Sequence, residues 1–236
     1  MSEYFTYFPT VEHDLTKVGQ KVTLTNVLRR FIVRNDLQER SDIFYKYNVQ
    51  VGDRPDIIAE KYYGDADLAW LVLHFNNIKD PIFEFPLFGR DFENYIKGKY
   101  GSIPAARSEV HEYRRTLQEK QVKFDGTIIP ERYVVVDDAF LLWDTWNILT
   151  TYNKGNEVKY TDPETNVTRG YIALQDNMTG ENPKSNLSKW QLAGNPVTKY
   201  DWEEELNEKK REIKLLDKRF ADKVREEIET ILRDGI

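Results

Sequence analysis

The sequence predicts an α+β fold, and three observations carry this prediction. Residues 47–51 alternate apolar and polar side chains, the pattern of a half-buried strand. Residues 57–63 and 68–75 then repeat apolar side chains at three- and four-residue spacing, which is typical of helices with one buried face. Later in the chain, short β-type runs between turn residues lead to a charged C-terminal segment with helical periodicity.

The first strand is joined to the first helix by a tight turn at 52–55. Gly52 and Pro55 break the strand, and Asp53 can cap the helix that follows. Proline suits the first helical position, because the N–H there has no partner in the helix. Asn76 and Asn77 then end the second helix. The segment is therefore a strand–helix–helix core.

This core resembles the LysM module. The residues that match are Tyr47, Val49, Gly52, Asp53, Ile58, Ala59, Lys61, Tyr62, Asn76 and Asn77. The resemblance implies a groove between the turn at 52–55 and the loop at 76–81, with the site residues Gly52, Asp53, Arg54, Pro55, Asn76, Asn77 and Pro81. A LysM module closes with a second strand beside the first. That strand is either degenerate here or supplied from elsewhere in the chain.

The N-terminal segment is rich in aromatic residues. Tyr4, Phe5, Tyr7 and Phe8 lie within the first eight positions, and residues 26–38 follow as a predicted helix. So short an aromatic segment must dock on a larger surface. That surface is either the core of this chain or a partner.

Two β regions are predicted after the core. In the first, Asp125-Gly126 is a hairpin turn signal and Val134–Val136 is a predicted buried strand. The second, 146–194, contains Tyr152, Gly155, Val158, Tyr160, Tyr171, Ala173, Gly180, Pro183 and Trp190. In this pattern it resembles the small chitin-binding-type carbohydrate modules. The resemblance implies sugar contacts from the aromatic residues Tyr152, Tyr160, Tyr171 and Trp190. The alternative is that these side chains form the core of a compact adaptor.

The C-terminal segment 201–235 is predicted to form one long amphipathic helix. Its apolar stripe is a predicted partner interface, made of Leu206, Ile213, Leu216, Phe220, Val224, Ile228 and Ile231. The predicted divisions of the chain are an N-terminal arm and helix at 1–40, the LysM-like domain at 41–100, a β-hairpin region at 101–145, the small β module at 146–194 and this helix at 195–236.

Composition argues against several classes of function. A net charge of −6 disfavours nucleic acid as a partner, and the chain has no cysteine. No apolar run approaches eighteen residues, so no membrane-spanning helix is predicted. His13, His74 and His111 are scattered, and the G-x-S-x-G, H-E-x-x-H and P-loop motifs are not present. We therefore expect neither an enzyme nor a metal site or cofactor.

The order of these parts resembles the LysM-containing baseplate wedge protein of T-even-like contractile-tailed bacteriophages. Its most specific signature here is Tyr63-Gly64-Asp65 followed by Leu68-Ala69-Trp70. The resemblance implies a non-enzymatic virion subunit, made in the host cytoplasm. Its partners would be the core-bundle wedge subunits, neighbouring wedges and the lysozyme-like-fold, sheath-initiating wedge protein. The alternative is a module that binds peptidoglycan or chitin on a tail or cell-wall protein.

Overall fold

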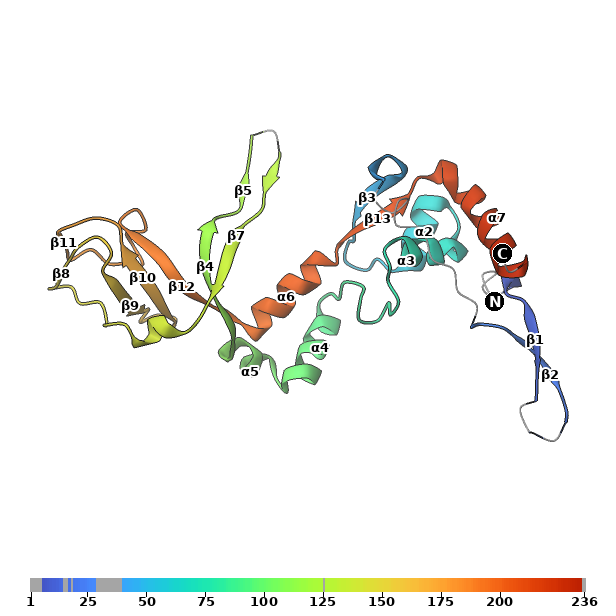
Figure 1. Ribbon diagram of the computed structural model, residues 1–236, viewed down its shortest axis with the longest axis horizontal. Helices are drawn as coiled ribbons and strands as arrows, with labels where there is room; N and C mark the ends of the chain where they lie inside the picture. The colour runs from blue at the N-terminus through green and yellow to red at the C-terminus, as the bar shows by residue number, and fades with distance from the viewer. Residues whose placement is uncertain (1–5, 15–16, 18, 29–39, 125, 235–236) are drawn as a thin grey trace. The chain divides into compact units, whose positions relative to one another are not determined.

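The computed structural model describes residues 6–14, 17, 19–28, 40–124 and 126–234 (Figure 1). It confirms the α+β class. The chain divides into two compact units, which are described one by one. Unit 1 joins Met1–Phe92 to Leu206–Ile236, and unit 2 is Glu93–Glu205. The division falls within α4 (Arg90–Tyr100) and α6 (Lys199–Lys209).

The first part of unit 1 follows the predicted strand–helix–helix order. A 3₁₀ turn, η2 (Ser41–Ile43), leads into β3 (Phe44–Asn48), and α2 (Pro55–Tyr63) begins with proline at its first turn. Gly64 ends α2 with a φ of 83°, a left-handed conformation that favours glycine. A short 3₁₀ turn, η3 (Ala66–Leu68), then leads into α3 (Ala69–Phe75).

The second strand of this core comes from the far end of the chain. Strand β13 (Glu212–Leu216) pairs antiparallel with β3, from Glu212 opposite Asn48 to Leu216 opposite Phe44. The Val49 N–H extends the ladder by donating to the Arg211 carbonyl at 2.9 Å. Of the two alternatives left open by the sequence, the strand is the one supplied from elsewhere.

The predicted single C-terminal helix at 201–235 is wrong. The structure has α6, then β13, then α7 (Lys218–Asp234). Backbone bonds from Lys210 and Arg211 back to Asn207 and Glu208 close the end of α6. Ile213 and Leu215 then alternate with exposed residues, so the burial of this stretch has the period of a strand.

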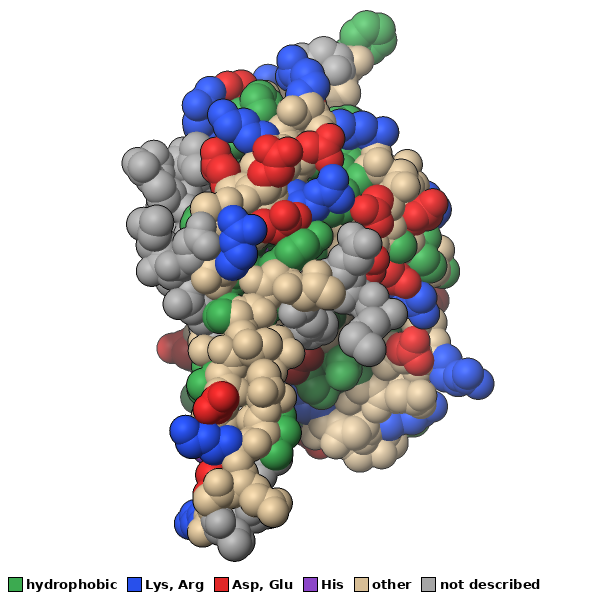
Figure 2. Space-filling model, turned by 90° about the vertical axis from the view of Figure 1, so that its right-hand side faces the viewer, with side chains coloured by type: hydrophobic (Ala, Val, Ile, Leu, Met, Phe, Trp, Pro, Cys, Tyr) green, Lys and Arg blue, Asp and Glu red, His purple; other side chains and the backbone are tan. Residues whose placement is uncertain are grey.

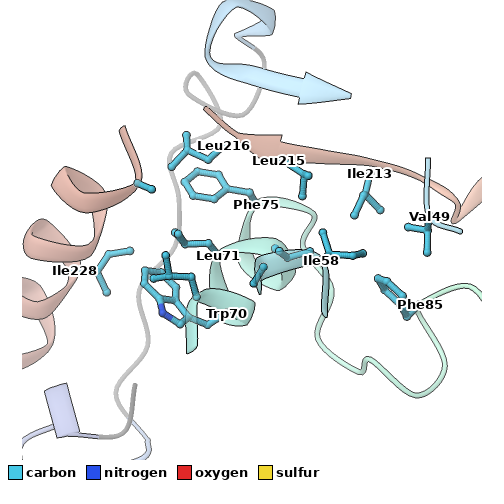
Figure 3. Close-up of a cluster of buried hydrophobic side chains, with 14 of the residues drawn as sticks. Val49, Ile58, Trp70, Leu71, Phe75, Phe85, Ile213, Leu215, Leu216 and Ile228 are labelled. Atoms are coloured by element: carbon cyan, nitrogen blue, oxygen red, sulfur yellow. The ribbon is translucent and has the colours of Figure 1, made fainter. Parts of the chain in front are cut away.

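One hydrophobic core holds unit 1 together (Figure 3). Trp70, Leu71 and Phe75 of α3 are buried in it, as their spacing predicts. Strand β13 contributes Leu215, which is fully buried, and α7 contributes Ile228. Sixteen buried side chains form this cluster: Phe8, Val49, Ile58, Ala59, Leu68, Trp70, Leu71, Val72, Phe75, Phe85, Ile213, Leu215, Leu216, Ala221, Ile228 and Leu232.

The described part of the N-terminal segment docks on this core. Phe8 is buried in the cluster, and Tyr7 packs against it. A hairpin that the sequence did not reveal follows, with β1 (Thr10–His13) paired antiparallel with β2 (Val22–Thr25). Tyr4, Phe5 and residues 29–38 of the predicted helix lie outside the described residues.

Unit 2 is built on a five-stranded antiparallel sheet in the order β7-β4-β12-β10-β9. The strands are β4 (Val110–Gln118), β7 (Arg132–Val136), β9 (Glu157–Thr161), β10 (Thr168–Ala173) and β12 (Trp190–Thr198). Helix α5 (Ile103–Ser108) precedes β4, and the Ser102 hydroxyl caps it by accepting from the Ala105 N–H at 3.2 Å.

Shorter elements complete unit 2. The hairpin of β5 (Gln121–Val122) and β6 (Ile128–Ile129) extends the β4–β7 pair. Gly126 of the predicted turn lies in the connection between β5 and β6. A 3₁₀ turn, η4 (Ala139–Leu142), follows β7, and β8 (Thr151–Tyr152) pairs with β11 (Met178–Thr179). Val134–Val136 is not buried as predicted. It forms β7 at the sheet edge, where Val135 is 60% exposed.

The predicted boundaries at 145/146 and 194/195 fall inside this sheet. Strand β12 pairs with β10 through Trp190–Gly194 and with β4 through Asn195–Thr198, so one strand belongs to both predicted regions. The Phe140 side chain lies directly against β10 and β12 at this boundary. A Cβ added at Gly170 or at Gly194 would lie within 3 Å of the Phe140 side chain. The β-hairpin region and the β module are therefore one structural unit.

Candidate assembly interface

The predicted interface stripe is divided between the core and the surface of unit 1. Ile213, Leu216 and Ile228 are buried in the cluster of unit 1, so they are not available to a partner. Leu206 and Val224 are half-buried. Phe220 and Ile231 remain exposed, at 37% and 40%.

Helix α7 has two adjacent faces. Ala221, Ile228 and Leu232 are buried at seven- and four-residue spacing and hold the helix on the core. Phe220 and Ile231 lie eleven residues apart, which is three helical turns, so both are on one side of the buried stripe. We call Phe220, Val224 and Ile231 the α7 ridge.

Charged groups of both signs surround this apolar strip. Arg225 of α7 lies 3.7 Å from the Asp65 carboxylate and 3.0 Å from that of Asp222. Figure 2 shows the right-hand side of Figure 1, where α7 is drawn, and blue and red side chains lie there among green hydrophobic groups. A surface with charges of both signs suits a protein partner better than it suits a strongly charged partner.

The predicted groove residue Asp53 serves the fold of the turn. Its side chain is 1% exposed, and it accepts hydrogen bonds from the Gln50 N–H (2.8 Å), Tyr47 Oη (2.7 Å) and Lys61 Nζ (2.6 Å). Burial raises the pKa of the Asp53 carboxyl, but these three donors outweigh it and hold the pKa below the usual range. Burial and the carboxylate raise the pKa of Tyr47 to about 12. Asp53 is not the predicted helix cap, because Arg54 occupies that position.

Asn76 anchors the C-terminal strand. Its side-chain amide accepts from the Lys214 N–H at 2.7 Å and donates to the Lys214 carbonyl at 2.7 Å and to the Val72 carbonyl at 2.8 Å. One side chain thereby satisfies both backbone groups of a β13 residue. This contact explains why a helix ending in asparagine lies beside β13.

The two halves of the predicted groove do not line one common hollow. Asn76 and Asn77 border a hollow of about 370 Å³ whose other wall includes Lys210 and Ile213. No residue of the turn at 52–55 lines it. Gly52, Arg54, Asn77 and Pro81 are exposed, and Pro55 is half-buried at the start of α2. The hydrogen bonds of Asp53 and Asn76 thus stabilise the fold of unit 1.

The predicted sugar-contacting aromatics of unit 2 form a second core. Tyr152, Tyr171 and Trp190 are at most 7% exposed, and Tyr160 packs against the cluster. Tyr152 and Trp190 meet edge to face with ring centroids 5.3 Å apart, and Trp190 Nε1 donates to the Glu181 carbonyl at 3.1 Å. Three of the four rings are thus unavailable for stacking on a sugar.

Sequence reasoning missed a buried polar cluster in unit 2. Glu203 of α6 accepts from Lys99 Nζ (2.6 Å), Tyr100 Oη (2.7 Å) and Tyr95 Oη (3.0 Å). Burial raises the pKa of Glu203, and these three hydrogen bonds more than reverse that effect and lower it. The only sequence signal was an acid run at 203–205, which gave no indication of burial.

Exposed apolar side chains outside the predicted sites were also missed. In unit 1, Ile82 and Phe83 are 69% and 57% exposed, and Lys210 Nζ fixes their loop by donating to the Phe83 carbonyl at 2.7 Å. In unit 2, Leu142 and Leu149 are more than 80% exposed. Isolated apolar residues in loops carry no periodic signal, so sequence patterns cannot separate them from core residues.

No group of three His, Asp or Glu side chains among the described residues could hold a metal ion. No helix in that part of the chain is long and apolar enough to span a membrane.

Residues 3–113 match the family model of base plate wedge protein 53. The match runs from the N-terminal segment through β3, α2 and α3 to Tyr113 of β4. It supports a phage baseplate wedge protein, a structural component of the virion tail. No curated protein matches the chain.

The base plate wedge match leaves β13 and α7 outside its range. These elements nevertheless complete the core of unit 1, because β13 is the only strand that pairs with β3 among the described residues. The matched segment therefore depends on the C-terminal segment for its fold.

Proposed function

We propose that this chain is a structural subunit of a phage tail baseplate wedge, and that it joins wedge proteins around the tail hub through protein–protein contacts. The match of residues 3–113 to the base plate wedge family carries this proposal. Its expected partners are the core-bundle wedge subunits, neighbouring wedges and the sheath-initiating wedge protein with a lysozyme-like fold.

The exposed apolar groups of unit 1 support a role in assembly. The α7 ridge and the loop with Ile82 and Phe83 present large apolar side chains on a unit whose core is already closed. The exposed parts of these side chains contribute little to the stability of the isolated unit. Apolar anchors with a polar rim are the usual composition of a protein interface.

We assign the α7 ridge to a wedge partner. This replaces the predicted seven-residue stripe with the part that the core leaves exposed. Phe220 is its strongest anchor, because aromatic side chains carry much of the binding energy at interfaces. The LysM-like part of the core would act as a scaffold, since Asp53 and Asn76 are engaged within the chain.

Gradient sedimentation with the other wedge proteins tests this assignment. The double variant Phe220→Asp, Ile231→Asp should keep its circular dichroism spectrum but fail to sediment with the wedge. The matched control is Val51→Asp, Leu187→Asp, which adds the same charge at two exposed apolar sites, 79% and 56% exposed. Co-sedimentation of the ridge variant at the level of the control would contradict the assignment of α7. If the wild-type chain failed to join any wedge protein, the proposed function itself would be wrong.

A further inference from the structure

The two edges of the sheet in unit 2 differ in whether another segment of the chain covers them. At the β9 edge, the Trp146 N–H donates to the Lys159 carbonyl at 2.8 Å, and the Lys159 N–H donates to the Asp144 carbonyl at 2.9 Å. Thr145 forms a parallel bridge to Lys159 in the same place. The segment 144–146 therefore covers the middle of this edge.

The β7 edge has no such cover within the described residues. Strand β7 pairs with β4 on one side and is the last strand of the sheet on the other. In an antiparallel pair, every second residue points its N–H and C=O away from its neighbour strand. Outside the β4–β7 ladder, no described residue forms a backbone hydrogen bond with Arg132–Val136. These outward groups can pair with another strand.

The residues of β7 also lack the usual protection of an edge. Natural edge strands commonly carry lysine, an inward charge, a proline or a bulge that blocks pairing. Tyr133–Val136 has no charge and no proline, and Val134 and Val135 are 36% and 60% exposed. The charged residues lie at the two ends instead, with Arg132 before this run and Asp137-Asp138 after it.

We propose that the β7 edge binds the β7 edge of a second copy of this chain, as an antiparallel pair that extends the sheet across two molecules. This goes beyond the proposed function and does not depend on it. A two-fold axis relates two such strands only if it is perpendicular to the sheet. Directly opposed residues then lie on the same face, and one residue of β7 faces its own copy.

The charged residues at the two ends of β7 favour one register of this pair. With Val135 opposite Val135 of the second copy, Val134 lies opposite Val136, and Tyr133 lies opposite Asp137, the first residue after the strand. Asp138 follows with a φ of −86° and a ψ of 10°, so the chain has turned out of the strand there. The pair is thus apolar in the centre, and Arg132 of each copy lies at the end that carries Asp137 and Asp138 of the other copy. Centring on Val134 instead would place Arg132 opposite Val136 and Glu131 opposite Asp137, two like charges. The strand is therefore complementary to itself, which argues for a second copy over an unrelated partner.

The interface is small, so the dimer should be weak. Stable specific interfaces bury about 1,200–2,000 Å² in total, more than one pair of five-residue edges supplies. The experiment therefore uses a covalent trap at high protein concentration. The chain has no cysteine, so each single-cysteine variant carries one thiol.

The variant Val135→Cys places that thiol at the centre of the proposed pair, where cross-strand Cβ atoms are close enough for a disulfide. In a glutathione redox buffer it should form a disulfide-linked dimer several-fold faster than Val51→Cys. Val51 is the control because it is even more exposed, at 79%, and lies in a turn of unit 1. Equal rates for the two variants would overturn the proposal.

A charge exchange tests the register on the Val135→Cys background. Arg132→Asp alone and Asp138→Arg alone should each slow the disulfide, because like charges then lie together at both ends. An equimolar mixture of the two variants should restore the rate through a mixed dimer, in which opposite charges again lie together at both ends. Rates that do not respond to these charges would overturn the proposal. It would also fail if a wedge protein, and not a second copy, protected the β7 amides from hydrogen exchange.

Discussion

Leu215 offers a sharp test of the helix–strand–helix arrangement at the C-terminus. The side chain is fully buried on β13, among residues of α2 and α3 that lie well over a hundred positions earlier in the chain. A continuous helix over 201–235 would instead bury Ile213 and Leu216 on one stripe and place Leu215 on the opposite side of the helix. The substitution Leu215→Ala therefore separates the two arrangements.

We expect Leu215→Ala to destabilise unit 1 by about 3–5 kcal/mol, the upper part of the range for leucine truncation in a closed core. That is a large share of the roughly 5–15 kcal/mol that stabilises a domain. The matched control is Ile231→Ala, whose side chain is 40% exposed and which should cost about 1 kcal/mol or less.

The assay is urea unfolding followed by fluorine NMR of protein labelled with fluorotryptophan. Trp70 is the only tryptophan of unit 1, and the other four lie in unit 2, so the two units are followed separately. The Trp70 transition should move to clearly lower urea in Leu215→Ala. If Leu215→Ala and Ile231→Ala shift it equally, β13 does not belong to this core and the arrangement is refuted.

Three further substitutions test local features. Asp53→Asn should cost about 1–3 kcal/mol at pH 7; because the folded-state pKa of Asp53 is lowered, this difference should shrink as the pH falls through that pKa, measured by urea unfolding between pH 7 and 3. Glu203→Gln should lower the melting temperature of unit 2 by removing the charge that pairs with Lys99, and an unchanged melt would contradict its buried pairing. Gly194→Ala should destabilise unit 2 by about 1–3 kcal/mol through a clash with Phe140, and Phe140→Ala in the same chain should relieve most of that effect, as a double-mutant cycle would measure.

Local periodicity was sufficient to predict the first part of unit 1. The three- and four-residue spacing of Leu68, Leu71 and Phe75 predicted a buried helix face, and Gly64 marked the break between the helices. These signals lie within a few residues of one another. They can therefore be recognised in the sequence without knowledge of distant contacts.

The C-terminal strand could not be predicted in the same way. Ile213 and Leu216 are three residues apart, a spacing that fits a helix as well as a short apolar strand. The deciding fact is the pairing of β13 with β3, in which Lys46 and Glu212, 166 positions apart, form an ion pair at 2.9 Å. Pairing over such a distance leaves no local signal.

The candidate sites show the same limit. Asp53 and Asn76 were predicted as groove residues, but their roles in the turn and at β13 depend on partners that only the fold brings together. In unit 2, Tyr152 and Trp190 were singled out as aromatic residues, and the pattern could not say whether they face a ligand or each other. Strand β12 crosses a predicted boundary because its second partner, β4, lies far away in sequence.

The proposal of a baseplate wedge subunit is tested most directly by cross-linking mass spectrometry on isolated tail baseplates. The account predicts that this chain is present in them and that lysines of α7, such as Lys223, cross-link to another wedge protein. Baseplates that contain the chain but show its only cross-links within itself would contradict the assigned α7 interface. Complete baseplates that lack the chain would contradict the central claim.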